Sequence, residues 1–173
     1  MLESVVATQN VRAKVGDFYL IGVAGSIRLT TGEAPDFIDI TDQVAQIVAD
    51  AHVAMGMVIV FTKHTTTAVV LNENESGLRK DVAAFLERMA PKAMYYEHND
   101  MDVRTENIVP DESPNGHSHA QSMVLGSTQL VPVILGTMAL GRWQRILLIE
   151  LDHPRDREVV VQVWGVGGGN GRH

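Results

Sequence analysis

The chain contains no cysteine, and that absence alone excludes several kinds of site. Disulfide scaffolds, thiolate zinc sites, iron–sulfur clusters and cysteine nucleophiles all need a thiol. Any metal ion bound by this chain must therefore use histidine and oxygen ligands.

Basic residues are also few. The sequence has 14 Lys and Arg against 21 Asp and Glu, a formal net charge of −7, and no basic cluster longer than Arg79-Lys80. Binding to a phosphate backbone needs a positive patch, and this sequence has none. The composition therefore argues against nucleic acid as a partner.

Long apolar runs are missing as well. No run approaches the about 18 residues of a membrane-spanning helix. The start, Met1-Leu2-Glu3-Ser4, lacks the basic and apolar regions of a signal peptide. We expect a cytoplasmic protein with no membrane partner.

The composition otherwise suits a folded domain. The chain has 173 residues, 45% of them hydrophobic, and a mean hydropathy of +0.02, which is enough to bury a sizeable core. We expect a single domain over residues 1–173, with its core at about residues 18–164. Residues 165–173 lack the lysine and following helix of a phosphate-binding loop and are expected to form a flexible glycine-rich tail.

The spacing of apolar residues predicts two clear helices. After Thr41, an expected N-cap, apolar residues recur at i, i+3, i+4 and i+7, the period of one helical face, and Gly56 ends that region. These residues are Val44, Ile47, Val48 and Ala51. A second helix is expected over residues 78–89, capped by Asn74 or Ser76 and closed by Pro91.

Short apolar runs between turn residues predict strands. The expected strands cover residues 18–30, 36–40, 57–61, 68–71, 127–135, 143–151 and 158–164. A polar loop at 92–115, of a length that is usually functional, and a short helix at 119–125 interrupt them. This order favours an α+β fold with a largely antiparallel sheet over a doubly wound fold.

Histidines supply the first candidate site residues. His64 follows an apolar strand and precedes three threonines, and His98 lies near carboxylates in the polar loop. His117 and His119 would point to the same side of an extended segment and could chelate one ion. Each also has a plain structural interpretation, as a strand end or a solvated loop residue.

Carboxylates and arginines supply the second set. Asn72 and Glu73 end a predicted strand, where they could cap the next helix or act as a base or ligand. Glu150 and Asp152 interrupt an apolar strand, and Arg155 and Arg157 follow at once. These residues could form an internal ion pair, or a carboxylate could face a pocket in which the arginines hold phosphate.

In combination, these segments resemble the YjbQ-like family, whose members are often labelled secondary thiamine-phosphate synthases. The resemblance spans about residues 18–164. It rests on His64-Thr65-Thr66, Asn72-Glu73, Tyr96-Glu97-His98, Asn115-Gly116-His117-Ser118-His119, Gly126-Ser127, Val131-Pro132-Val133, Gly141-Arg142-Trp143-Gln144 and residues 150–157.

The resemblance implies a fold of two packed, mainly antiparallel sheets with flanking helices. It also implies a homotrimer with sites near subunit interfaces. Three histidines match the family's pattern as metal ligands, His64, His98 and His119. His117 stands where other members commonly carry a different residue, and Ala120-Gln121 departs from the usual apolar and basic pair.

The functional hypothesis is a metal-assisted enzyme acting on a small phosphorylated metabolite. The three matching histidines would hold a divalent ion, zinc or else magnesium or manganese, and Glu73 or Glu150 would handle a proton. Substrate binding is assigned to Thr65, Thr66, Asn72, Asn115, Arg155 and Arg157. The reaction implied by the resemblance joins a pyrimidine-methyl diphosphate to a thiazole phosphate with release of pyrophosphate.

Three alternatives remain open. The same residues could serve a metal-dependent hydrolase of a small metabolite, with a metal-bound water as nucleophile. The chain could instead be a non-catalytic trimeric protein that binds a small anion. Finally, the histidines could be structural and hold the 92–119 segment against the sheet.

Overall fold

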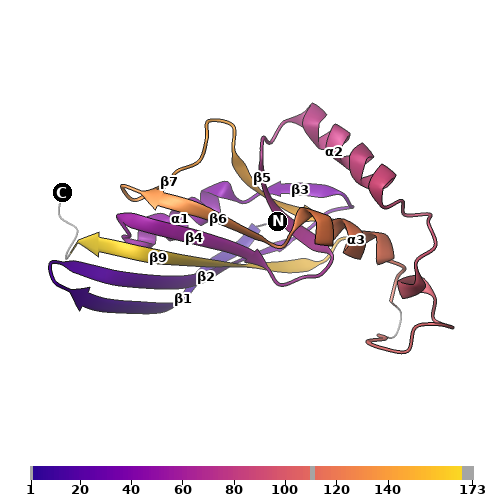
Figure 1. The fold of residues 1–173 in the computed structure, drawn as a ribbon, viewed down its shortest axis with the longest axis horizontal. Helices are drawn as coiled ribbons and strands as arrows, with labels where there is room; N and C mark the ends of the chain where they lie inside the picture. Colours follow the sequence, from indigo (N-terminus) through magenta and orange to yellow (C-terminus); the bar gives the residue numbers. More distant parts are fainter. Residues whose placement is uncertain (1, 110–111, 169–173) are drawn as a thin grey trace.

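Two antiparallel sheets form the frame of the molecule, as the computed structural model describes it for residues 2–109 and 112–168. The larger sheet has the strand order β1-β2-β9-β4-β6-β7 and the smaller one β3-β8-β5 (Figure 1). The strands are β1 (Leu2–Val15), β2 (Phe18–Thr30), β3 (Asp36–Asp39), β4 (Met55–Thr62), β5 (Thr67–Asn72), β6 (Thr128–Ile134), β7 (Thr137–Met138), β8 (Arg145–Glu150) and β9 (Asp156–Gly168). The predicted α+β fold of two mainly antiparallel sheets with flanking helices is confirmed.

Helices lie between the strands. They are α1 (Thr41–Ala51), α2 (Ser76–Met89), the short 3₁₀ helix η1 (Glu97–Asn99) and α3 (Gly116–Leu125). None of the helices in the described part of the chain is both long and apolar enough to cross a membrane.

The main core lies on one face of the larger sheet. The buried residues of α1 are the ones its apolar period predicts, and they share a cluster with inward residues of β4 and β9 such as Val58 and Val161. Leu148 of β8 belongs to the same cluster, so the smaller sheet and α1 together cover this face. The other face of the larger sheet carries exposed apolar side chains.

The predicted helix caps need correction. Thr41 is the first residue of α1 rather than its N-cap, and Asp39 Oδ1 accepts hydrogen bonds from the Thr41 N–H and hydroxyl at 3.0 and 2.6 Å. The helix ends before His52, which has a φ of 54°, and Gly56 lies inside β4. At α2, the cap is Glu75, whose carboxylate accepts from the Gly77 and Leu78 N–H groups.

The predicted glycine-rich tail is wrong for residues 165–168, which belong to β9, while residues 169–173 lie outside the described residues. The reason is close packing. A Cβ on Gly165 would lie 2.3 Å from the Met55 carbonyl oxygen, and one on Gly56 would lie 2.0 Å from the Trp164 carbonyl oxygen. Glycine here allows β4 and β9 to approach each other.

A strand also precedes the expected core, whose first buried residue is Ile21. β1 pairs with β2 along almost its whole length, from Leu2↔Leu29 to Val15↔Phe18. The chain reverses between them at Gly16, whose φ is 62°. The ordered fold therefore includes an N-terminal strand that the apolar pattern alone did not reveal.

Candidate functional site

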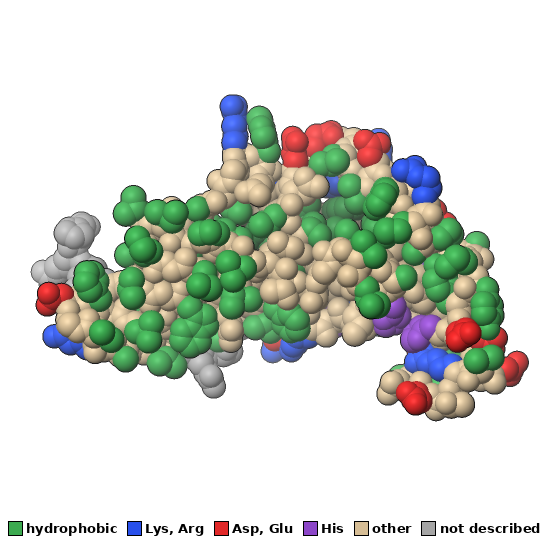
Figure 2. All heavy atoms as spheres, viewed as in Figure 1, with side chains coloured by type: hydrophobic (Ala, Val, Ile, Leu, Met, Phe, Trp, Pro, Cys, Tyr) green, Lys and Arg blue, Asp and Glu red, His purple; other side chains and the backbone are tan. Residues whose placement is uncertain are grey.

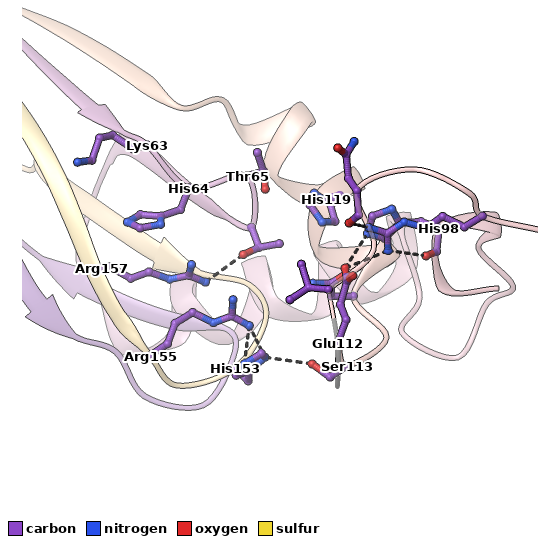
Figure 3. Close-up of a pocket in the computed structure, with 15 residues that line it drawn as sticks. Lys63, His64, Thr65, His98, Glu112, Ser113, His119, His153, Arg155 and Arg157 are labelled. Carbon is purple, nitrogen blue, oxygen red and sulfur yellow. Dashed lines mark hydrogen bonds and ion pairs between the residues drawn. The ribbon is translucent and has the colours of Figure 1, made fainter. Parts of the chain in front are cut away.

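A cavity of about 740 Å³ opens where several segments distant in sequence meet (Figure 3). Its walls are the turn between β4 and β5, the loop between α2 and α3, the start of α3 and the turn into β9. Four cationic side chains and one carboxylate line it, and each of the four cations is paired with a carboxylate: Lys63 with Glu158, Arg104 with Glu112, Arg155 with Asp152 and Arg157 with Glu150. The lining residues are Lys63, His64, Thr65, Thr66, His98, Arg104, Asn107, Val109, Glu112, Ser113, Asn115, His119, His153, Arg155 and Arg157.

A buried ion pair underlies the cavity. Glu150 is fully buried, and its two oxygens accept from Arg157 Nη2 at 2.5 Å and Arg157 Nε at 2.6 Å. The Thr31 hydroxyl and the Asp152 N–H also donate to this carboxylate. Arg157 Nη2 further donates to Thr66 Oγ1 at 3.0 Å, which ties the pair to the turn after β4. Glu150 itself does not line the cavity, so the structure shows the internal ion pair rather than an exposed base.

A second polar cluster surrounds Asp152. Its carboxylate accepts from Arg155 Nη2 at 2.7 Å and from Asn115 Nδ2 at 3.2 Å, and His153 Nδ1 lies 2.9 Å away. Burial alone would raise the pKa of Asp152, but hydrogen bonds from His153 and Asn115 offset burial and lower it. Asp152 therefore stays ionised and fixes Arg155 at the cavity wall.

The long loop is held mainly by two side chains. Arg104 donates to the carbonyl oxygens of His98, Glu106 and Asn107 and pairs with Glu112 at 3.0 Å. Asn99 Oδ1 accepts from the Asn115 and Gly116 N–H groups and so caps α3 across the loop. The wall of the cavity is thus built by contacts within the loop and with the start of α3.

His64 has a defined tautomer in this arrangement. Its Nε2 accepts a hydrogen bond from the Glu158 N–H at 2.9 Å. Burial and the nearby Arg157 charge lower the pKa of His64, so the ring is neutral at pH 7 and carries its proton on Nδ1. His64 therefore presents a donor, rather than a free lone pair, to any ligand.

His98 and His119 meet on the opposite wall. Their ring centroids lie 4.5 Å apart with the planes at 68°, and His98 Nε2 lies 3.5 Å from Glu112 Oε1, too far for a hydrogen bond. Burial and the neighbouring His98 lower the pKa of His119, and the hydrogen bond from Arg104 lowers that of Glu112. The described residues leave His98 Nε2 and Glu112 Oε2 without hydrogen-bond partners.

The sequence model of the family described as UPF0047 protein YjbQ-like matches residues 25–166. The chain belongs to the YjbQ-like family. A relative from Archaeoglobus fulgidus, named UPF0047 protein, is 40% identical over 79% of this chain and 97% of its own length. One from Methanothermobacter thermautotrophicus, with the same name, is 39% identical over 79% of this chain and 88% of its own length.

Solved structures agree. A YjbQ-like protein of unknown function from Sulfolobus solfataricus has a TM-score of 0.76 at 32% identity, covering 84% of this chain and 99% of its own. An uncharacterised yjbq/upf0047 family protein from Clostridium acetobutylicum has a TM-score of 0.70 at 32% identity, covering 80% of this chain and 98% of its own. The names of these four relatives state no reaction, ligand or metal.

In this YjbQ-like chain most of the predicted site residues meet at the cavity. His64, His98, His119, Thr65, Thr66, Asn115, Arg155 and Arg157 all line it. Asn72 and Glu73 do not. Asn72 pairs with Arg145 at one end of β5, whereas Thr67 at the other end pairs with Glu150 near the cavity floor. Both residues are exposed at that distant end.

The two neighbouring histidines of α3 do not share a side. The sequence argument assumed an extended segment, but α3 begins at Gly116, and residues two apart on a helix are about 200° apart. His119 lines the main cavity, while His117 lines a separate one of about 110 Å³ behind Asp152. A chelate between the two is therefore excluded by the helix.

The predicted metal set does not fit as the residues lie. His64 Nε2 is engaged by the Glu158 amide, and its Nδ1 carries the proton. No group of three or more His, Asp or Glu among the described residues is close enough to hold a metal ion. The divalent ion stays a prediction.

Sequence reasoning missed several residues that build the site. Lys63, Arg104, Glu112 and His153 line the cavity without having been singled out as site residues. Lys63, next to His64, and His153, between Asp152 and Arg155, could have been found by their neighbours. Arg104 had no such signal, because its role depends on carbonyl groups that the loop folds around it.

Proposed function

We propose that the cavity binds the phosphate or diphosphate group of a small metabolite. The observation that carries this is the set of hydrogen-bond donors at the lining: four cationic side chains, each held in place by a carboxylate partner, and the imidazole of His64. Lys63 and Arg155 lie at the wall, and His64 adds an Nδ1–H donor between charged neighbours. Arg157 is committed to Glu150 and Thr66, so it contributes charge and rigidity to the floor.

Proton transfer is the second capacity of the lining. Burial lowers the pKa of His119, which keeps this imidazole neutral at pH 7 and able to accept a proton. Its ring lies against His98, whose proximity adds to the lowering of the His119 pKa. A bound phosphate would stabilise the protonated form and thereby assist transfer from a ligand hydroxyl or a water molecule.

Binding can be tested with inorganic pyrophosphate as the probe. Isothermal titration should detect binding to the wild-type chain, and Arg155→Ala and Lys63→Ala should each weaken it by about tenfold, as expected for loss of one charge-assisted contact. Lys80→Ala, which removes an exposed cation on α2 far from the cavity, is the matched control and should bind normally. Equal affinity in all four proteins would refute the proposal.

The reaction class we propose is the one implied by the family resemblance, with hydrolysis of a phosphorylated metabolite as the alternative. Thiamine-phosphate synthase-type transfer needs a site that stabilises the pyrophosphate leaving group, which the cationic wall supplies. Incubation with pyrimidine-methyl diphosphate, with and without thiazole phosphate, distinguishes transfer from hydrolysis. Pyrophosphate release that needs both substrates supports transfer, and release from the first alone supports hydrolysis. Binding without turnover leaves the third candidate, a small-anion binding protein.

The predicted divalent ion has its own test. Two unpartnered buried atoms beside His119, His98 Nε2 and Glu112 Oε2, are the observation that favours it. Inductively coupled plasma mass spectrometry of tag-free protein should show about one zinc, manganese or magnesium ion per chain if the loop closes on a metal. That ion should be lost in His98→Ala and His119→Ala.

We further propose that the protein works as a homotrimer. The outward side of β4 carries Met55, Met57 and Phe61, all exposed, and Phe61 lines a second cavity together with His64 and His119. A second copy of the chain that covered the outward side of β4 would therefore border the candidate site. Sedimentation equilibrium should give three times the chain mass of 18.9 kDa, and a mass equal to one chain would refute the assembly.

A further inference from the structure

A second cavity of about 420 Å³ adjoins the cavity described above. We call it the side cavity, and its volume lies within the range of small-molecule sites, about 300–1,000 Å³. The two cavities share Lys63, His64, Thr65 and His119 as lining residues. In Figure 3, Thr65 is drawn between His64 and His119 at this border. A ligand held in the main cavity can therefore extend past these residues into the side cavity.

The side cavity differs from the main one in its chemistry, because the residues that line it alone are uncharged. Two of them present apolar side chains, Phe61, which is 39% exposed, and Met123, which is 87% exposed. Figure 2 shows hydrophobic side chains next to surface histidines near the end of the molecule where α3 lies in Figure 1. The residues that line the side cavity but not the main one are Phe61, Thr62, Ser122, Met123, Gly126 and Ser127.

The polar groups of the side cavity are engaged within the chain. Ser122 Oγ donates to the Thr67 carbonyl oxygen at 2.8 Å, and Thr62 Oγ1 lies 2.5 Å from Thr67 Oγ1 in a hydrogen bond. The carbonyl oxygen of Gly126 accepts from an amide of β5, and that of Ser127 accepts from the Thr62 N–H. A polar group bound here would lose hydrogen bonds to water and gain few in return, whereas a hydrocarbon group has none to lose.

We propose that the ligand is a phosphate ester of an apolar alcohol, with its phosphate in the main cavity and its hydrocarbon group in the side cavity. The inference rests on the proposed anion site and names the group to which the phosphate is attached. The ester oxygen would lie at the shared border, where His64 offers its Nδ1–H. Burial of the hydrocarbon against Phe61 and Met123 would add affinity that inorganic phosphate cannot gain. Methionine suits this position because its flexible side chain adapts to the shape of an apolar group.

The test uses two esters of the same shape, benzyl phosphate and pyrimidin-5-ylmethyl phosphate, in which two ring nitrogens replace C–H groups. Isothermal titration should show benzyl phosphate binding at least about tenfold more tightly, since the ring nitrogens lose water without finding donors. Phe61→Ser and Met123→Ser should each reduce this preference to about threefold or less, because an apolar contact with the ring is lost. Met123→Leu keeps an apolar side chain and should retain the preference.

Val124→Ser is the matched control. It changes the residue after Met123 on α3, is 64% exposed, and lines neither cavity, so the preference should equal that of wild type. Circular dichroism checks that each variant folds. Sedimentation equilibrium checks whether each variant keeps the wild-type mass, because Phe61 also lies on the outward side of β4 proposed as a contact between copies.

The outcomes separate this inference from the proposed function. If neither inorganic pyrophosphate nor either ester binds, the proposed anion site fails and the inference fails with it. If pyrophosphate binds and the two esters bind equally well, the inference fails alone. An unchanged preference in both serine variants would show that the hydrocarbon group lies elsewhere and would overturn the assignment of the side cavity. Loss of the preference together with a lower mass would assign Phe61 and Met123 to the contact between copies and would overturn it as well.

Discussion

The buried pair of Glu150 and Arg157 allows a quantitative prediction. Glu150 is fully buried, and all of its four hydrogen bonds come from within the chain, two of them from Arg157. Arg157→Met would leave a carboxylate without its counter-charge in a site that water does not reach. The sequence allowed two roles for Glu150, a catalytic base or an internal ion partner, and this substitution distinguishes them.

The magnitude follows from the burial. Removing one partner of a buried ion pair typically costs about 3–5 kcal/mol, because the remaining charge is desolvated and uncompensated. For a chain of this length each kcal/mol lowers the melting temperature by about 2–4 °C, so Arg157→Met should lower it by about 6–20 °C. Replacing both residues, as in Glu150→Leu with Arg157→Met, removes the uncompensated charge and should recover at least about half of that loss.

Thermal unfolding followed by circular dichroism provides the assay. The wild type, both single variants and the double variant are compared at one protein concentration, because association also contributes to the melting temperature. Single variants that melt within about 2 °C of wild type would refute the ion-pair role. A Glu150→Gln variant that keeps its stability and pyrophosphate binding but loses turnover would instead support the catalytic role.

Three further predictions follow from the geometry. Burial lowers the pKa of His64 and His119 below 6.5, so unfolding takes up protons, and the urea midpoint should fall as the pH drops below about 6.5. An unchanged midpoint at pH 5.5 would contradict this. So would a variant with both histidines replaced by asparagine whose midpoint depends on pH as steeply as that of wild type. Gly165→Ala forces a Cβ against the β4 backbone and should cost about 1–3 kcal/mol in urea unfolding, whereas Gly32→Ala, beside a flexible side chain, should cost less. Arg104→Ala should make the loop between α2 and α3 cleavable by thermolysin, a protease that does not need an arginine or lysine, while α1 stays protected. Equal cleavage of the wild-type loop would show that Arg104 does not hold it.

The elements that the sequence predicts well are those whose signal is local. The period of α1 follows from residues that face one core, so the pattern and the packing agree. The same holds for β4 and β5, whose short apolar runs are buried on the inward side. Caps were harder, because Asp39 and Glu75 act through side chains that also suit turns and exposed surfaces.

The elements that the sequence missed depend on distant residues. β1 is mixed in polarity and is a strand because β2 offers it an edge. The start of α3 depends on Asn99, which lies 16 residues before the Asn115 amide it caps. Residues 165–168 have the composition of a linker, yet glycine is required there by the approach of β4.

The candidate site shows the same division. Residue types alone singled out most of the histidines and arginines that line the cavity, but not Arg104 or His153. Their mutual arrangement could not be predicted. The helical start of α3 separates His117 from His119, and the Glu158 amide occupies His64 Nε2. The first contact leaves His119 at the cavity without His117, and the second gives His64 an Nδ1–H donor there.

The floor and the wall of that pocket have different origins, and this bears on specificity. The floor is fixed by sheet register, since Glu150 opposes Thr67 in the smaller sheet and Arg157 opposes Leu29 in the larger one. The wall is a loop whose form depends largely on Arg104 and Asn99. A phosphate group bound over the floor would meet rigid charges, whereas the rest of the ligand would contact the loop. Changes in the loop should therefore alter which metabolite is accepted while leaving pyrophosphate affinity nearly constant.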